Sequence, residues 1–268
     1  MRLWVLGSGS SGNSILLEAG DTRILIDAGF FPRTLAMRLR SCGAPPESVQ
    51  ALIITHEHSD HVRGAAAAAS RWGWEIHASA GTVRACRALA NAHAFRAGDA
   101  VSIGHVKVQT VRIAHDAADP VAIVACDERT GVRAAVAHDL GGPNDALRRA
   151  LERVDVLVLE SNHDEEMLRT GPYPPFLRAR IAGARGHLAN RVAGQLARGA
   201  AHAGLREVVL AHLSEQNNTP AAAHRAMAAA LRGTRFTGRL TPASQREPCG
   251  PFGPKTAAPR ARQLQFAL

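Results

Sequence analysis

The sequence is short of lysine, cysteine and tyrosine. Lysine occurs only twice, at Lys107 and Lys255, so nearly all of the 32 basic residues are arginines. The four cysteines are far apart and form no Cys-x-x-Cys pair, which excludes a disulfide-rich secreted scaffold and fits reduced thiols. No apolar run approaches the roughly 18 residues that a membrane-spanning helix needs. Met1 leads directly into a short apolar stretch, without the charged and cleavable regions of a secretory signal. We therefore expect a cytoplasmic protein with no membrane partner.

The chain has 268 residues, of which 46% are hydrophobic, so it can bury a large core. No linker interrupts it, and we expect one domain over residues 1–268, with an irregular tail from 241 to 268 that could end in a last strand at 262–268. The formal net charge is +9. Because guanidinium groups suit phosphate oxygens, this charge fits a polyanionic partner. The arginine bias fits equally well the base composition of a genome, so both interpretations stay open.

Short apolar runs alternate with helical patterns, which indicates an α/β protein. Nearly continuous apolar runs are typical of strands buried on both faces, and they occur at 49–56, 154–161 and 206–214. Further strands are expected within 2–27, at 74–79 and 100–115, and in a hairpin over 121–141. Helices are expected at 33–42, 65–72, 82–94 with Thr82 as its cap, 145–153, 188–204, and 221–231 after Thr219 and Pro220.

One stretch places several ionisable side chains together at the end of a buried strand. In ITHEHSDHVRG, His56, His58, Asp60 and His61 fall within six positions. A strand end followed by a tight loop lets His56 and His58 bind one ion while Asp60 and His61 turn toward a second. Crowded ionisable groups at a buried position would be costly without a cation to compensate them. The stretch therefore predicts two metal ions.

Four ligands are too few for two ions, so further ligands are expected at other strand ends. His115 closes one strand, Asp139 another and His212 a third. A lone histidine at a strand end is more often a structural residue. These three residues are candidate metal ligands only because the cluster at 56–61 is present. Because neighbours on a strand alternate, His138 is expected to face away from Asp139.

The pattern HxHxDH, followed by one His, one Asp and one His at strand ends, resembles the metallo-β-lactamase-fold hydrolase superfamily. The resemblance implies a four-layer αββα sandwich with a dinuclear site at one edge. It also implies that Asp27 holds a ligand histidine by a hydrogen bond. The implied ligands are His56, His58 and His115 for the first metal, Asp60, His61 and His212 for the second, and Asp139 as the bridge. Aspartate in place of the cysteine of true β-lactamases argues against antibiotic hydrolysis.

A narrower resemblance covers almost the whole chain. It is carried by LGSGSSGNS, LIDAG, ITHEHSDHVRG, AHDAADP, HDLG, LESNHDEEML, GPYPPFLRARIAGARGHLAN and LAHLSEQNNTP, which are similar to segments of the YycJ/WalJ-like family. This family implies a metal-dependent nuclease, a DNA exonuclease linked to repair. Ala189 departs from the family's GHLSN, and the lost hydroxyl is expected to weaken a substrate contact.

Three further features each have a structural alternative. His187 in GHLAN is interpreted as the acid that protonates the leaving oxygen, although it could simply cap the following helix. The Gly/Ser-rich turn Ser8–Ser14 is expected to be a hairpin near the rim of the site, with contact to a substrate phosphate as the alternative. His163 is expected to be a loop residue, with a role as a metal ligand or proton relay as the alternative.

These observations predict a dinuclear metal-dependent phosphodiesterase, with a nuclease favoured. Zn²⁺ is the favoured metal and Mn²⁺ the alternative, Asp60 orients the attacking water, and His187 is the general acid. DNA is favoured over RNA as the partner, and the sequence does not predict the oligomeric state. A small-molecule hydrolase of thioesters, lactones or cyclic nucleotides would use the same ions. A non-catalytic nucleic-acid-binding module is the second alternative, and the complete ligand set argues against it.

Overall fold

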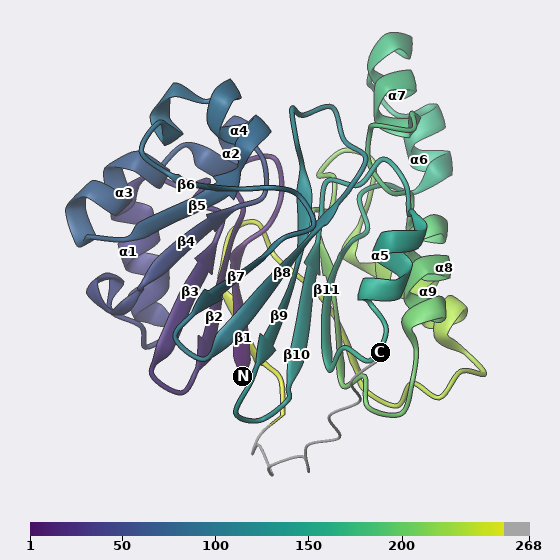
Figure 1. The fold of residues 1–268 in the computed structure, drawn as a ribbon. Helices are drawn as coiled ribbons and strands as arrows, with labels where there is room; N and C mark the ends of the chain where they lie inside the picture. Colours follow the sequence, from purple (N-terminus) through teal and green to yellow (C-terminus); the bar gives the residue numbers. More distant parts are fainter. Residues whose placement is uncertain (255–268) are drawn as a thin grey trace.

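The computed structural model describes residues 1–254. Two seven-stranded sheets pack face to face, and helices cover the outer face of each sheet (Figure 1). This is the four-layer αββα sandwich that the family resemblance implied. No helix of the described part of the chain is long and apolar enough to cross a membrane.

The first sheet has the strand order β14-β1-β2-β3-β4-β5-β6. Its amino-terminal strands form an antiparallel meander, and β3 to β6 are parallel. The bounds are β1 Arg2–Gly7, β2 Ser14–Ala19, β3 Thr22–Ile26, β4 Ala51–Ile54, β5 Glu75–Ser79, β6 His93–Phe95 and β14 Cys249–Phe252. Strand β14 pairs antiparallel with β1 and closes this sheet at its edge.

The second sheet has the order β13-β12-β11-β10-β9-β8-β7. Strands β7 to β10 are antiparallel, and β10 to β13 are parallel. The bounds are β7 Ala100–Ile103, β8 Val106–Arg112, β9 Val121–Asp127, β10 Arg133–Ala137, β11 Val156–Glu160, β12 Glu207–Ala211 and β13 Arg239–Pro242. Parallel neighbours end at the same edge of a sheet, so side chains that follow these strands meet there.

Helices α1 to α4 lie on the first sheet, and α5, α8 and α9 lie on the second (Figure 1). Helices α6 and α7 stand at the top edge of the molecule, above the second sheet. The bounds are α1 Pro32–Ser41, α2 Ser59–Val62, α3 Ala65–Trp72, α4 Ala80–Ala85, α5 Asp145–Ala150, α6 Glu165–Thr170, α7 Pro175–Ala182, α8 Asn190–Ala200 and α9 Pro220–Leu231, with 3₁₀ turns η1 Pro46–Ser48 and η2 Arg87–Leu89.

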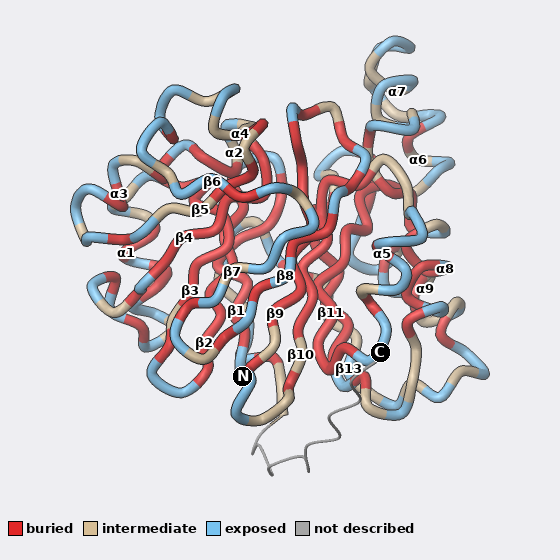
Figure 2. Tube along the Cα trace, viewed as in Figure 1, coloured by how far each residue is buried: buried red, intermediate tan, exposed pale blue. Residues whose placement is uncertain are grey.

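Three layers of apolar side chains hold the sandwich together. The central layer joins the inner faces of the two sheets, and one further layer lies between each sheet and its helices. Strands β4 and β11 are buried along their whole length, as their continuous apolar sequences predicted (Figure 2). Strand β12 is buried along its whole length too. Rigid strands therefore position the residues that follow them.

The structure corrects two predictions about elements. The helix expected over 82–94 is the shorter α4, and the chain enters strand β6 before residue 94. The cap of α4 is Ser79 and not Thr82: the Ser79 hydroxyl accepts a hydrogen bond from the Thr82 backbone N–H. The tail expected to be irregular from residue 241 contains the end of β13 and all of β14. The last strand considered at 262–268 lies outside the described residues.

Candidate metal centre

The expected ligands come together at one edge of the sandwich, where strands of both sheets end. The loop after β4 and the short α2 carry His56, His58, Asp60 and His61 from the first sheet. From the second sheet, His115 follows β8, Asp139 follows β10 and His212 follows β12. The site thus lies between the two sheets and takes ligands from each.

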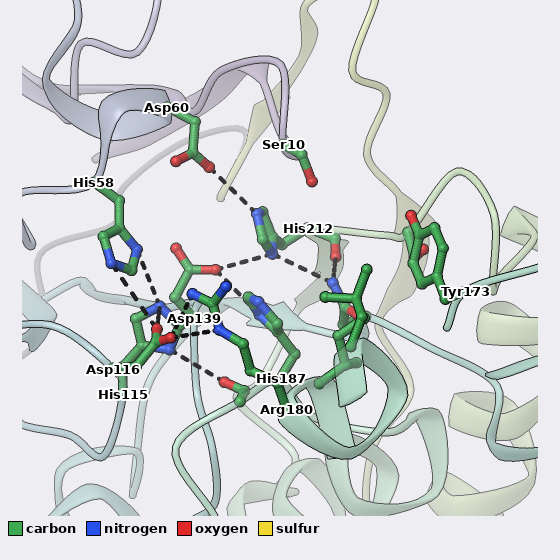
Figure 3. Close-up of a pocket in the computed structure, with 15 residues that line it drawn as sticks. Ser10, His58, Asp60, His115, Asp116, Asp139, Tyr173, Arg180, His187 and His212 are labelled. Atoms are coloured by element: carbon green, nitrogen blue, oxygen red, sulfur yellow. Dashed lines mark hydrogen bonds and ion pairs between the residues drawn. The ribbon is translucent and has the colours of Figure 1, made fainter. Parts of the chain in front are cut away.

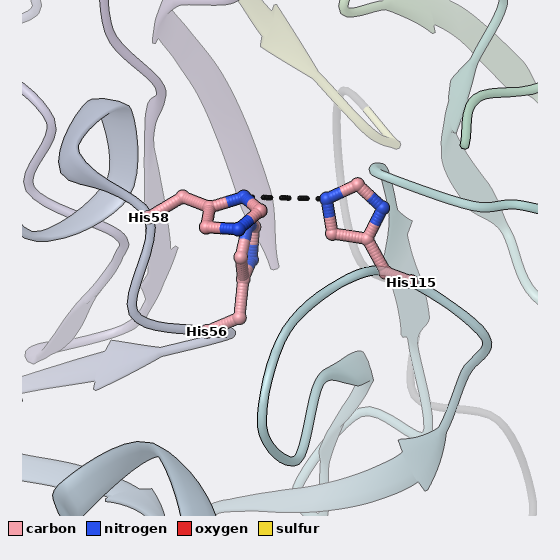
Figure 4. A group of neighbouring side chains, drawn as sticks. All are labelled: His56, His58 and His115. Atoms are coloured by element: carbon pink, nitrogen blue, oxygen red, sulfur yellow. Dashed lines mark hydrogen bonds between the residues drawn. The ribbon is translucent and has the colours of Figure 1, made fainter. Parts of the chain in front are cut away.

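His56, His58 and His115 form the first group (Figure 4). The His115 Nε2 lies 3.3 Å from the His58 Nδ1, and the ring centroids of His56 and His58 are 4.7 Å apart. One nitrogen of each ring falls within 4.8 Å of the others, a spacing at which a single ion can bind all three.

Asp60, His61 and His212 form the second group. The Asp60 Oδ2 lies 3.4 Å from the His61 Nε2 and 3.7 Å from the His212 Nε2. Asp60 is the most exposed of the three side chains and faces the cavity, whereas both rings are buried. Two nitrogens and a carboxylate oxygen are suitable ligands for a divalent ion.

Asp139 lies between the two groups. Its Oδ2 is 2.6 Å from the His61 Nε2 and 3.5 Å from the His56 Nε2, and its Oδ1 is 2.9 Å from the His212 Nδ1. The carboxylate therefore touches histidines of both groups at once. This is the position that a bridging ligand requires.

Buried polar atoms without hydrogen bonds mark the centre of the site. In the described part of the chain, the Nε2 atoms of His56 and His212 and both carboxylate oxygens of Asp139 are buried and make no hydrogen bond. A buried polar atom without a partner costs free energy, of the order of 1–3 kcal/mol. Cations would satisfy all four atoms together, so these residues fit divalent metal ions.

Hydrogen bonds donated from Nδ1 leave Nε2 available on three of these histidines. His61 donates from Nδ1 to Asp27 at 2.8 Å, His115 to the Gly186 carbonyl at 3.1 Å, and His212 to Glu160 at 3.1 Å. Such bonds fix the tautomer and the orientation of a ligand ring. Asp27 is fully buried and also accepts from the Thr55 backbone N–H at 2.8 Å, which holds its carboxylate in place.

The backbone is strained at the site. Asp27, Asp139 and His212 have φ values of 59°, 55° and 52°, in the left-handed region that non-glycine residues rarely adopt. Each follows the end of a strand, and the left-handed turn directs its side chain into the gap between the sheets. Such strain gathers at functional sites because the surrounding structure enforces it.

The charges of the site are strongly coupled. Burial disfavours a charged His61 or His212, but Asp139 and a second carboxylate beside each ring outweigh burial and raise the pKa of both histidines. Burial would raise the pKa of Asp139, yet His212 and His61 lower it. Burial lowers the pKa of His56. The centre therefore combines ionised carboxylates with imidazoles, a mixture that suits cations.

Glu160, the last residue of β11, also belongs to the site, although it was not among the predicted site residues. Its side chain is fully buried and accepts four hydrogen bonds, from His187, His212 and the backbone N–H groups of Leu140 and Leu188. Burial would raise its pKa, but the charge of His187 and the hydrogen bonds from His187 and His212 lower it to about 2. A carboxylate at the end of an otherwise apolar, buried strand was the signal that could have revealed it.

His187 lies beside the ligands at the floor of an open cavity of about 270 Å³ (Figure 3). Its Nδ1 donates to the Glu160 Oε1 at 2.7 Å and lies 3.4 Å from the Asp139 Oδ1. Tyr173, the only tyrosine of the chain, and Arg180 line the same cavity. With Nδ1 engaged by Glu160, the other ring nitrogen remains for a substrate.

The surroundings of the ligands include His138 and the Gly/Ser-rich turn. His138 is buried behind His61, and its Nε2 lies 3.0 Å from the Asp27 Oδ2. The turn Ser8–Ser14 belongs to the site, since the Ser8 hydroxyl accepts from the His212 backbone N–H and the Asn13 side-chain amide contacts Asp60. His163 lies outside the two groups described above, in the wall of a second cavity.

Comparison with known proteins agrees with this geometry. A family model described as the metallo-beta-lactamase superfamily matches residues 7–159. The exodeoxyribonuclease WalJ of Streptococcus pneumoniae is 31% identical over 232 residues, covering 83% of this chain and 85% of that protein. The exodeoxyribonuclease YycJ of Bacillus anthracis is 30% identical over 220 residues, covering 80% of this chain and 83% of that protein. The crystal structure of the metallo-beta-lactamase fold protein YhfI from Bacillus subtilis superposes with a TM-score of 0.71 at 18% identity, covering 92% of this chain and 98% of that chain.

Proposed function

The chain belongs to the metallo-beta-lactamase superfamily and to the family of WalJ and YycJ, and from this premise we propose that it is a DNA exonuclease that works with two divalent ions. The observation that carries the proposal is the buried set of unpartnered ligand atoms around Asp139. The names of the two relatives support DNA as the substrate. We place the enzyme in DNA repair, as the family resemblance implies, and in the cytoplasm, in keeping with the sparse cysteines, which fit reduced thiols.

In this proposal one ion is held by His56, His58 and His115, and the other by Asp60, His61 and His212. Asp139 bridges the two ions. Nitrogen and carboxylate donors favour Zn²⁺, with Mn²⁺ as the alternative. When bound, a pair of divalent ions supplies an acidified water as nucleophile and positive charge opposite the scissile phosphate.

The protein groups then have distinct tasks. Asp60, exposed to the cavity and held by Asn13 at 3.1 Å, orients the attacking water. His187 protonates the departing oxygen, because Glu160 holds its ring with one nitrogen left toward the cavity. General acid help of this kind is worth roughly 10²–10⁴-fold in rate.

A nuclease panel tests the substrate. End-labelled single- and double-stranded DNA and RNA would be incubated with the protein in defined Zn²⁺ or Mn²⁺, and the product ends would report the direction of attack. The matched control is His212→Ala, which should lose metal and activity together. If the wild-type protein degrades no strand but hydrolyses thioesters, lactones or cyclic nucleotides, the nuclease proposal is wrong.

A second test concerns His187. His187→Ala should keep both ions and near-normal DNA binding, while turnover falls by roughly 10²–10⁴-fold. A substrate with a low-pKa leaving group needs little protonation and should partly restore the rate of this variant. Equal losses on natural and activated substrates, or loss of metal, would show that His187 is a structural residue or a ligand.

A further inference from the structure

His187 lines two cavities. One contains the metal centre, and the other, of about 470 Å³, lies between α6, α7 and the start of α8. Apart from His187, the second cavity contains none of the residues assigned above to metal binding or catalysis. Its wall includes Arg169, Arg178, Arg191 and His163.

The amino-terminal end of α8 forms part of this wall. Its cap residue is Ala189, which lines the cavity and offers no side-chain acceptor to the first turn of this 11-residue helix. The first N–H groups of a helix carry a partial positive charge and need acceptors from outside the helix. Ala189 cannot cap the helix with its side chain, so N–H groups of the first turn are left open to an external anion.

His163 gives a second and independent indication of a ligand. It is 3% exposed and lines the cavity, and its Nδ1 has no hydrogen-bond partner in the described part of the chain. Its backbone carbonyl accepts from the Asn190 N–H at 2.8 Å, which fixes it against the start of α8. Burial lowers the pKa of His163, which favours the neutral ring, and a neutral imidazole can still donate one hydrogen bond.

The charges in the wall favour an anion. Arg191 pairs with Glu165 at 3.0 Å. Arg169 pairs with Glu166, whereas Arg178 donates to the Arg169 carbonyl and has no carboxylate partner among residues 1–254. Glu165 is the only acidic residue in a wall that holds three arginines. The cavity thus keeps an excess of positive charge.

We propose that this second cavity binds a phosphate group of the substrate strand, next to the scissile phosphate on the side of the departing oxygen. The inference rests on the proposed nuclease function. His187 lines both cavities, so a strand whose leaving oxygen is protonated by His187 continues into the second one. Binding the neighbouring phosphate there anchors the nucleotide that carries the departing oxygen and fixes that oxygen at His187.

The test measures binding of short DNA strands whose phosphorothioate linkages resist cleavage, using the metal-loaded protein. Three strands are compared, with a 5′-phosphate, a 3′-phosphate or no terminal phosphate. The double variant Arg178→Gln, Arg191→Gln removes two phosphate donors at exposed or partly exposed positions, and Arg225→Gln on the exposed face of α9 is the matched control. Glu165→Gln removes the carboxylate that competes for Arg191.

The double variant should bind about tenfold or more weakly than the control, and Glu165→Gln should bind more tightly than wild type. Loss confined to one phosphorylated strand identifies a terminal phosphate as the ligand, and equal loss on all three identifies an internal one. If the double variant matches Arg225→Gln on every strand while wild type binds and cleaves DNA, the inference is wrong and the nuclease function stands. If wild type neither binds nor cleaves any strand, the proposed function itself is wrong.

Discussion

Replacing Glu160 with glutamine should damage stability and catalysis together. The two carboxylate oxygens divide their hydrogen bonds: Oε1 accepts from His187 at 2.7 Å and His212 at 3.1 Å, and Oε2 accepts from the backbone N–H groups of Leu140 at 2.6 Å and Leu188 at 3.2 Å. A glutamine has one oxygen and one NH₂ group, so in either orientation two donors face another donor.

The expected loss of stability follows from the number of donors that lack an acceptor in the variant. A buried donor without an acceptor costs roughly 1–3 kcal/mol, so two of them should lower the free energy of unfolding by about 2–6 kcal/mol. If the amide turns its NH₂ group toward the histidines, His187 and His212 also lose their fixed orientation. Loss of such a supporting contact lowers metal affinity or activity by about 10–100-fold.

The assays are denaturant unfolding, metal content after gel filtration, and turnover on labelled DNA. Glu166→Gln is the control, because this exposed carboxylate pairs only with Arg169 one turn along α6 and its loss should change little. A Glu160→Gln protein with wild-type stability, metal content and turnover would refute the reasoning, since Glu160 would then only fill space.

Three further outcomes are expected. Asp139→Ala should bind fewer than two ions per chain, because one carboxylate serves both groups, and metal analysis showing full occupancy would contradict the bridging role. DNA binding should weaken with salt along a log–log slope of about −0.9 per neutralised phosphate, and a flat titration would favour a small-molecule ester. Ala189→Ser should raise the free energy of unfolding by about 0.5–2 kcal/mol by capping α8, and an unchanged or lower denaturation midpoint would count against the cap.

The ligand groups were predictable because their signals are local. His56, His58, Asp60 and His61 share one short stretch, and the structure places them as the alternation of directions in that stretch suggests. The strand-end positions of the remaining ligands could be read from apolar runs, since buried parallel strands end at a common edge. Their metal-binding roles remain predictions.

Other features depend on contacts that the sequence does not reveal. Glu160 acquires its role from His187 and His212, which lie 27 and 52 positions away. Helix α7 escaped prediction because it has no apolar face, and all eight of its residues are at least partly exposed. Strand β14 contains Gly250 and Pro251, which argue against a strand in general but are tolerated at the edge of a sheet.

The left-handed backbone at Asp27, Asp139 and His212 has an evolutionary consequence. Each such conformation costs of the order of 1–3 kcal/mol for a residue other than glycine. Glycine at any of the three positions would relieve that cost while abolishing the side chain that the chemistry needs. The backbone conformation alone would therefore favour glycine, so selection against glycine at these positions must come from the contacts and the chemistry of the side chains.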